Sequence, residues 1–293
     1  MLIYELTSYC REMYNKCTEC TPCTHPTGKC SGGCHICSEE INWHGEYPNG
    51  RIGYNCSKYL NYYVCRYSWK YCSEIIHALE LVDLSKYPKY KILSIGCGGA
   101  PDLMAFEYLN ENKKITYHGY DITPDWEAIH DRIEWYCTFQ EKINVHFSRG
   151  RSNGDFVNSV KDGLSGRYNV IIMEYVLSHI VASNSKEAIL PLFRSIGNII
   201  LRNRYEKSPF LIIINDIDHF GVRDYYDILI DSLQDCGLKG TLYKRHFKER
   251  NRDYNDDSIR HKNRDMPFTI PYNIDEFNCA IELTSSQLIV EVT

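Results

Sequence analysis

The stretch KILSIGCGGAPDLMAFEYL, residues 91–109, decides the fold of this chain. Its first five residues suit a short buried strand, and a helix is expected from Pro101, since proline is favoured in the first helical turn. Between them, Gly96 and Gly98 allow a sharp turn and let a ligand approach the main chain without a Cβ in the way. The helix start behind the loop favours a negative group such as a carboxylate. The stretch therefore predicts a strand, a ligand-binding loop and a helix.

The segments that follow continue the alternation of strands and helices that is typical of a parallel sheet. A second strand, residues 115–120, ends at Asp121, and an acid in this place can hold both hydroxyls of a ribose. The pattern predicts an α/β domain over residues 89–293.

Three motifs resemble those of the class I, or Rossmann-like, S-adenosylmethionine-dependent methyltransferases. ILSIGCGG (92–99) resembles the glycine-rich first motif, HGYDI (118–122) the second-strand acid, and NVIIMEYVLSHI (169–180) the fourth strand with the helix after it. The resemblance implies a mostly parallel Rossmann-like sheet whose last strand is antiparallel, and S-adenosylmethionine as the methyl donor. It also implies later strands within residues 169–173, 210–218, 241–247 and 287–292, with a helix around residues 225–235. It also implies a donor site made of Gly96, Cys97, Gly98, Gly99, Asp121, Ile122, Glu174 and Tyr175.

The chain departs from the family pattern at two positions. Ser94 stands where the family often has an acid, and Ala100 replaces a third glycine. The dinucleotide motif GxGxxG is also broken, because Pro101 occupies a spacer position and Asp102 the place of the last glycine. This break argues against a dehydrogenase.

Glu174 is the candidate catalytic residue, as an acid that orients or deprotonates the methyl acceptor. The alternative is a carboxylate that only caps the following helix. His179, in the same helix, is expected to pack. Because methyl transfer needs mainly the alignment of acceptor, methyl carbon and sulfur, the reaction requires no fixed catalytic residue.

Cysteines are concentrated near the N-terminus, where ten of the fourteen lie within the first 72 residues. The segment KCTECTPCTHPTGKCSGGCHIC, residues 16–37, holds six candidate zinc ligands: Cys17, Cys20, Cys23, Cys30, Cys34 and Cys37. The first pair and the last pair form CxxC turns, which together can complete the tetrahedral sulfur shell of zinc, and the middle pair suits a second ion. Residues 1–56 are therefore expected to form a small module stabilised by one or two zinc ions. An iron–sulfur cluster and a reduced loop without metal are the alternatives.

Residues 57–82 carry apolar side chains at steps of three and four, which predicts a helix with one buried stripe. We expect residues 57–88 to connect the two parts of the chain, with this helix lying over the cofactor pocket. Its aromatic residues either pack in the core or line the pocket, with Arg66 or a tyrosine reaching the carboxylate of the donor. Cys65 and Cys72 are expected to be buried and inert.

Residues 239–264 are basic, with nine Lys and Arg against four Asp and Glu. Residues 244–264 are expected to be an insertion between the last two strands, and its cations and aromatic residues suit RNA. A zinc module ahead of a class I domain also resembles bacterial ribosomal RNA methyltransferases, so RNA is the expected methyl acceptor. The alternatives are a solvated loop with a protein or small-molecule acceptor, and a non-catalytic protein that binds or senses the nucleoside.

The overall composition narrows the classes of partner. The net charge of −5 provides no general affinity for nucleic acids or anionic membranes. The sequence has no apolar run as long as a membrane helix, and MLIYELTSYC at its start lacks the pattern of a secretory signal. We therefore expect a cytoplasmic protein without a membrane partner.

Overall fold

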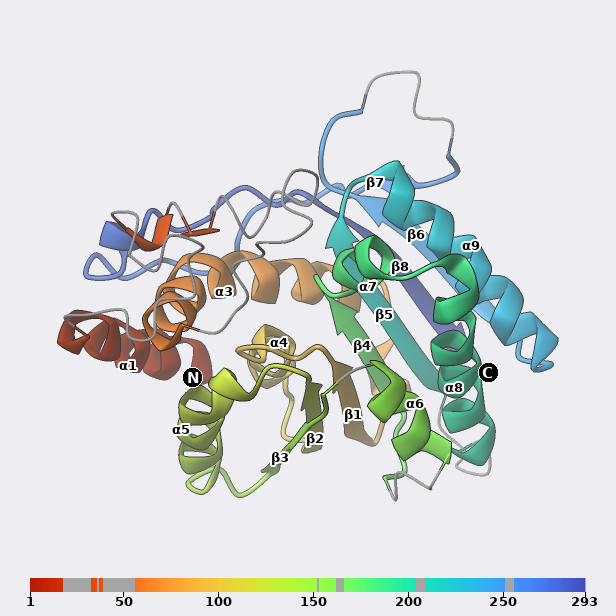
Figure 1. Ribbon diagram of the computed structural model, residues 1–293, viewed down its shortest axis with the longest axis horizontal. Coiled ribbons are helices and arrows are strands. Elements are labelled where there is room, and N and C mark those ends of the chain that lie inside the picture. Colours follow the sequence, from red (N-terminus) through yellow and green to blue (C-terminus); the bar gives the residue numbers. More distant parts are fainter. Residues whose placement is uncertain are drawn as a thin grey trace.

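The computed structural model describes residues 1–17, 33–35, 37–38, 56–151, 153–161, 166–203, 209–250 and 256–292. These residues form an eight-stranded sheet in the order β3-β2-β1-β4-β5-β8-β6-β7 (Figure 1). The strands are β1 (Lys89–Ile95), β2 (Lys114–Asp121), β3 (Ile143–Arg149), β4 (Val170–Glu174), β5 (Phe210–Ile217), β6 (Gly240–His246), β7 (Ile259–Arg260) and β8 (Ser285–Val292). β8 runs antiparallel between β5 and β6, whereas the other neighbouring pairs are parallel. The predicted mostly parallel α/β sheet with an antiparallel last strand is confirmed.

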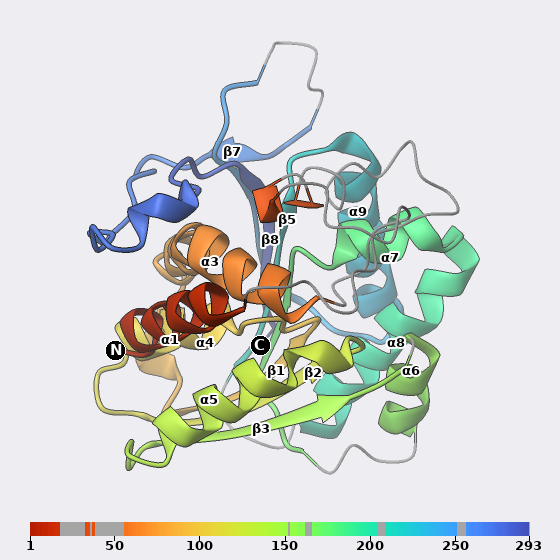
Figure 2. The same cartoon turned by 60° about the vertical axis from the view of Figure 1, so that its left-hand side comes forward.

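Helices cover both faces of this sheet (Figure 2). One face is covered by α3 (Ser57–Leu79), α4 (Pro101–Tyr108) and α5 (Glu127–Cys137), and α1 (Leu2–Lys16) packs on these three helices. The other packs against α6 (Asn153–Lys161), α7 (Leu177–Ser183), α8 (Lys186–Asn203) and α9 (Phe220–Asp235). Neighbouring residues of β1 therefore enter different cores, Ile92 on the first face and Leu93 on the second, as expected for strands buried on both sides. Three short 3₁₀ helices complete the elements: Leu84–Lys86, Pro124–Trp126 and Asp275–Phe277.

Helix α1 shares a core with the large domain. Leu2, Ile3, Leu6 and Cys10 lie at helical spacing and are buried in the same cluster as the apolar residues of α3. This spacing predicts a helix from the sequence. The sequence analysis did not predict it, because residues 1–56 were interpreted as one cysteine-rich module. The division of the chain at residues 56 and 88 stays a prediction.

The helix predicted over residues 57–82 and the insertion predicted over residues 244–264 differ from the observed elements in their bounds. The helix predicted over residues 57–82 is α3, which ends at Leu79. The predicted insertion contributes residues 244–246 to β6 and residues 259–260 to β7, so part of it belongs to the sheet. None of the described helices is both long and apolar enough to cross a membrane.

Candidate active site

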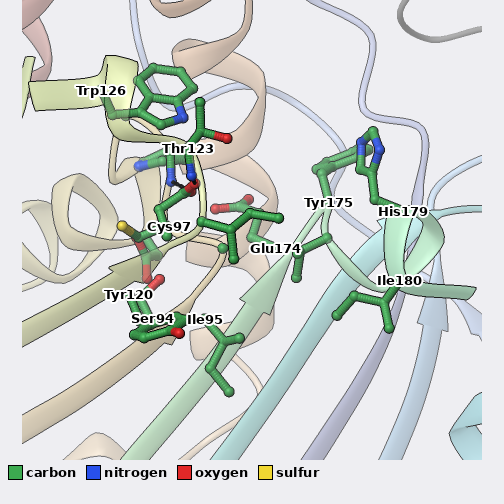
Figure 3. Close-up of a pocket in the computed structure, with 18 of the residues that line it drawn as sticks. Ser94, Ile95, Cys97, Tyr120, Thr123, Trp126, Glu174, Tyr175, His179 and Ile180 are labelled. Carbon is green, nitrogen blue, oxygen red and sulfur yellow. Dashed lines mark hydrogen bonds between the residues drawn. The ribbon is translucent and has the colours of Figure 1, made fainter. Parts of the chain in front are cut away.

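A cavity of about 320 Å³ lies at the carboxyl ends of β1, β2 and β4 (Figure 3). The strand order reverses at this point, because β1 pairs with β2 on one side and with β4 on the other. All eight predicted donor-site residues line the cavity: Gly96, Cys97, Gly98, Gly99, Asp121, Ile122, Glu174 and Tyr175. Figure 3 shows Trp126 on one side, His179 on the other and Glu174 between them.

The glycine loop after β1 takes backbone conformations that favour glycine. Gly96 and Gly98 have φ values of 70° and 46°, and a Cβ on Gly96 would lie 2.4 Å from Cγ2 of Val176. Ala100, in the place of the third glycine, also has a positive φ of 55°. The amides of Gly96 and Cys97 donate to the carbonyl of Tyr120 at 2.7 and 3.2 Å, which holds the loop against β2.

Asp121 joins this loop to the end of β2. Its Oδ2 accepts a hydrogen bond from the amide of Gly98 at 2.9 Å, and its Oδ1 accepts one from the amide of Thr123 at 2.8 Å. Burial raises the pKa of this carboxyl, against the lowering effect of these hydrogen bonds. Each oxygen of a carboxylate can accept two hydrogen bonds, so Asp121 can hold the loop and a ribose together.

Cys97 is unsuited to act as a nucleophile. Its Sγ lies 3.9 Å from Nε2 of His130, but burial raises the pKa of the thiol well above its ordinary value. Burial also lowers the pKa of His130 to about 4, so this imidazole is neutral and does not stabilise a thiolate. The pair is consistent with a packed loop.

Helix α3 lies over the cavity and lines it with Tyr63 and Tyr71. The ring of Tyr71 stacks on Tyr175 at a centroid distance of 4.1 Å and on Tyr67 at 5.5 Å. Tyr175 holds a φ of 49°, a strained conformation for an aromatic residue and a common mark of functional sites. Arg66 points elsewhere, since it donates to the carbonyls of residues 277 and 278.

A buried polar network that the sequence analysis did not include lies beneath Tyr175. Glu74 of α3 accepts hydrogen bonds from the Tyr175 hydroxyl at 2.9 Å and from Nδ2 of Asn215 at 3.1 Å. The same amide donates to Oε1 of Glu174 at 3.1 Å. Burial, then the charges of Asp102 and Glu74, raise the pKa of Glu174 well above its ordinary value. The sequence offered one signal for this network: Glu74 is an acid among the apolar residues of the helix predicted over residues 57–82.

Asp102, in the first turn of α4, is a further cavity residue that was missed as a site residue. It is 1% exposed, accepts a hydrogen bond from Tyr117 at 2.9 Å, and accepts another from Ser94. Burial raises its pKa to about 6. Ser94 is not an acid, but Asp102 brings a carboxyl group to the same region from the first turn of α4. In the sequence, Asp102 lies three residues after the glycine loop.

Comparisons with known proteins found similar solved structures. No family model matches the sequence, and no curated protein matches it either. The structure is similar to a SAM-dependent methyltransferase from Archaeoglobus fulgidus, at 16% identity over 75% of this chain and 94% of that chain, with a TM-score of 0.40. It is also similar to precorrin-6y C5,15-methyltransferase from Geobacter metallireducens GS-15, at 14% identity over 76% and 88% of the two chains, with a TM-score of 0.39.

The chain has a Rossmann-like α/β fold. The strand order and the antiparallel β8 carry this assignment. The [4+2]-cyclase SpnF is similar as well, at 12% identity over 59% of each chain, with a TM-score of 0.39. A fold does not by itself name a reaction.

Half of the six predicted metal ligands belong to the part of the chain that the structure describes. Cys20, Cys23 and Cys30 fall outside the described residues. Of the other three, Cys34 is buried, and Cys17 and Cys37 are partly exposed. Among the described residues no group of three metal-ligating side chains could hold an ion, so the zinc prediction depends on the remaining cysteines.

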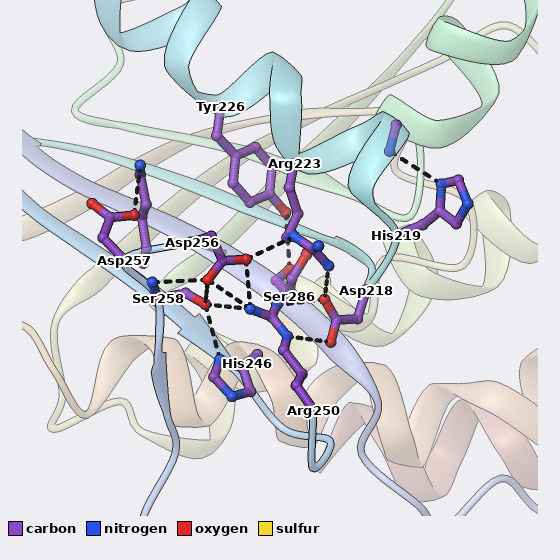
Figure 4. Close-up of polar contacts among 12 residues, drawn as sticks. Asp218, His219, Arg223, Tyr226, His246, Arg250, Asp256, Asp257, Ser258 and Ser286 are labelled. Carbon is purple, nitrogen blue, oxygen red and sulfur yellow. Dashed lines mark hydrogen bonds and ion pairs between the residues drawn. The ribbon is translucent and has the colours of Figure 1, made fainter. Parts of the chain in front are cut away.

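The basic insertion forms ion pairs with the rest of the chain (Figure 4). Arg250 contacts Asp218 and Asp256, donating to Oδ2 of Asp218 from Nε at 2.9 Å. Arg223 of α9 contacts the same two acids, and Lys244 pairs with Asp227 at 2.9 Å. Much of the positive charge counted in residues 239–264 is therefore neutralised within the protein.

Proposed function

We propose that this protein binds S-adenosylmethionine in the cavity and transfers its methyl group to an acceptor that enters beside Glu174 and Tyr175. The supporting observation is that a glycine loop, a second-strand acid and an aromatic wall meet in one cavity where the strand order reverses. S-adenosylmethionine supplies a methyl group on positively charged sulfur, so the protein has mainly to align the reactants.

The residues of the cavity divide into parts that suit the donor. The loop of residues 96–99 offers main-chain groups close to a ligand, and Asp121 suits the ribose hydroxyls. Ile122 is partly exposed beside Asp121 and suits an apolar cover for the adenine. Trp126 and the tyrosines of α3 close the opposite side.

Glu174 suits a role at the acceptor, but its protonation limits that role. Since burial and the charges of nearby acids raise its pKa well above the ordinary value, the neutral form of its carboxyl is favoured when the cavity holds no cation. In that state it donates a hydrogen bond and cannot remove a proton. We propose that it orients the acceptor, and acts as a base only where a bound positive charge lowers its pKa.

The test is calorimetric titration with S-adenosylmethionine. We expect Asp121→Ala to lose roughly 2–4 kcal/mol of binding free energy, because two charge-assisted hydrogen bonds disappear. Asp125→Ala, an exposed acid four residues away, is the matched control and should bind as the wild type does. Unchanged affinity in Asp121→Ala would contradict this site. A labelled-methyl assay on RNA, protein and small-molecule fractions then separates transfer from non-catalytic binding.

We propose RNA as the methyl acceptor, on evidence separate from that for the donor. The charge excess that favoured RNA is reduced by the ion pairs of Arg250 and Lys244. Lys248 and Lys262 remain exposed on the insertion and are the cations best placed to contact phosphate. A protein or small-molecule acceptor is the alternative that the same labelled-methyl assay distinguishes.

We also propose zinc at the N-terminal cysteines, supported by the two CxxC pairs. Elemental analysis of the purified protein is expected to find at least one zinc ion per chain. Cys17→Ser should release metal, whereas Cys236→Ser, at the far end of α9, should retain it. Less than one equivalent of zinc, or the absorbance of an iron–sulfur cluster, would contradict the proposal.

A further inference from the structure

Two buried carboxyl groups line the cavity, each with one oxygen that lacks a hydrogen-bond partner among the described residues. Asp102 is 1% exposed and Glu174 is 8% exposed. Oδ1 of Asp102 is bonded to Tyr117 and Oε1 of Glu174 to Asn215, at 2.9 and 3.1 Å. Oδ2 of the first and Oε2 of the second have no partner in that part of the chain. Buried polar atoms are almost always hydrogen-bonded, so two such oxygens at one cavity indicate a missing donor.

The two acids come from different elements and influence each other. Asp102 begins α4 and Glu174 ends β4, and after burial the charge of Asp102 is the largest influence that raises the pKa of Glu174. Neither the glycine loop nor β4 carries a cation at the cavity. A pair of buried acids is stable only if it is protonated or meets a positive charge.

The cation whose charge acts on Glu174 is already engaged with another acid. Lys70 lowers the pKa of Glu174, but its Nζ lies 3.9 Å from Oε1 of Glu74 and donates to Oγ1 of Thr284 at 2.6 Å. It also lies 5.1 Å from the ring centroid of Tyr175, on the α3 side of that residue. Lys70 therefore balances Glu74, and the cavity side of Asp102 and Glu174 keeps its need for a cation.

We propose that Asp102 and Glu174 together receive a primary ammonium group, that of the methionyl part of the donor. The proposal rests on the proposed function and adds which residues recognise the charged end of that ligand. An ammonium has three donors and no acceptor, which suits two carboxylate oxygens that both lack a donor. A metal ion suits the pair less, because the described residues provide no third ligand beside them.

Binding is then linked to protons. The ammonium favours the carboxylate form of both acids, so its arrival lowers their pKa values and releases protons to the buffer. Other ionisable groups face the pair from several elements: Glu74, Lys70 and Cys72 of α3, Cys97 and Asp121 of the loop and β2, and Tyr117 of β2. The pKa of Asp102 is about 6, so affinity for an ammonium ligand should fall as the pH is lowered through 6.

The experiment compares two ligands that differ in one group. S-adenosylhomocysteine carries the ammonium, and its deamino analogue has hydrogen in that place. We expect Asp102→Asn to weaken the first by about tenfold or more and the second by less than about twofold, since only the first loses a charge-assisted hydrogen bond. Asp121→Asn is the matched control at the ribose and should weaken both ligands equally.

A second measurement needs no variant. Calorimetry of the wild type at pH 6.5, in two buffers of different ionisation enthalpy, should show proton release with S-adenosylhomocysteine and little with the deamino analogue. Equal losses for both ligands in Asp102→Asn, or equal proton release, would overturn the inference. If neither ligand binds the wild type, the proposed function itself fails, which is a different result.

Discussion

Buried acids have different surroundings in the cavity and in the ion-pair cluster of Asp218, Asp256, Arg223 and Arg250, called here the Asp218 cluster. At the cavity, Asp102 and Glu174 each keep an oxygen without a partner in the described structure, and burial raises both pKa values. In the Asp218 cluster, Asp218 and Asp256 each meet both Arg223 and Arg250 (Figure 4). There the pKa of Asp256 is lowered, because bonds from Ser258 and the two guanidinium charges outweigh burial.

Under the proposed function, Asp102 and Glu174 interact with a ligand, whereas Asp218 stabilises the fold through its ion pairs. Side chains of Asp218 and Arg250 are 4% and 7% exposed, so desolvation is severe and has to be repaid by pairing. The cavity acids are as deeply buried, yet neither Asp102 nor Glu174 forms an ion pair with a described residue. Neutralising an acid should therefore have opposite effects on stability in the two regions.

The largest effect is expected at Asp218. Asp218→Ala should lower the free energy of unfolding by about 3–5 kcal/mol, because two buried arginines lose a shared partner. Asp227→Ala is the matched control, since its side chain is 67% exposed where it pairs with Lys244, and it should cost less than about 1 kcal/mol. Urea denaturation measures both. Equal costs would show that the Asp218 cluster is no more than a surface ion pair.

Asp102→Asn should do the reverse and stabilise the protein without ligand. Its folded pKa of about 6 lies above the ordinary 3.8, so the carboxyl contributes stability when protonated and loses it as the pH rises from about 4 to about 6. Asparagine does not ionise, so the variant should gain up to about 3 kcal/mol over the wild type at pH 7 and nothing at pH 4. A variant less stable than the wild type at pH 7 would show that Asp102 is structural.

The smallest effect on stability is expected at exposed cations outside both regions. Lys248→Glu combined with Lys262→Glu should change the free energy of unfolding by less than about 0.5 kcal/mol per site. If the insertion contacts RNA, the same double variant should reduce the salt dependence of RNA binding by about one unit per lost contact. Parallel salt dependence in wild type and variant would contradict an RNA contact at this insertion.

The lining of the cavity was largely predictable because the requirements of the glycine loop and of the strand ends are local. Gly96 and Gly98 have the positive φ values that their loop needs, and Asp121 follows directly from the end of a strand. The eight residues predicted from three short motifs line one cavity, since parallel strands bring their carboxyl ends to the same edge. Strand β3 lacked a comparable motif, and only the sheet shows its place beside β2.

The partners of charged residues were not predictable in the same way. Counting cations in residues 239–264 indicated a binding surface, but Arg250 meets Asp218, 32 positions earlier. Glu74 and Tyr175 are 101 positions apart and share a hydrogen bond. Because three of the six cysteines lie outside the described residues, the zinc site stays a prediction from the CxxC spacing.

The sequence by itself determined the Rossmann-like sheet, the glycine loop and the acid at the end of β2. These depend on turns, on alternation and on residues only a few positions apart, where sterics and burial act directly on the local chain. Only the tertiary structure decided which acids are paired and which keep a buried oxygen without a partner among the described residues. The charge state of a carboxyl is set by burial and by neighbours in space, and those neighbours come from α3, α4, β4 and β5, which the linear sequence does not place side by side.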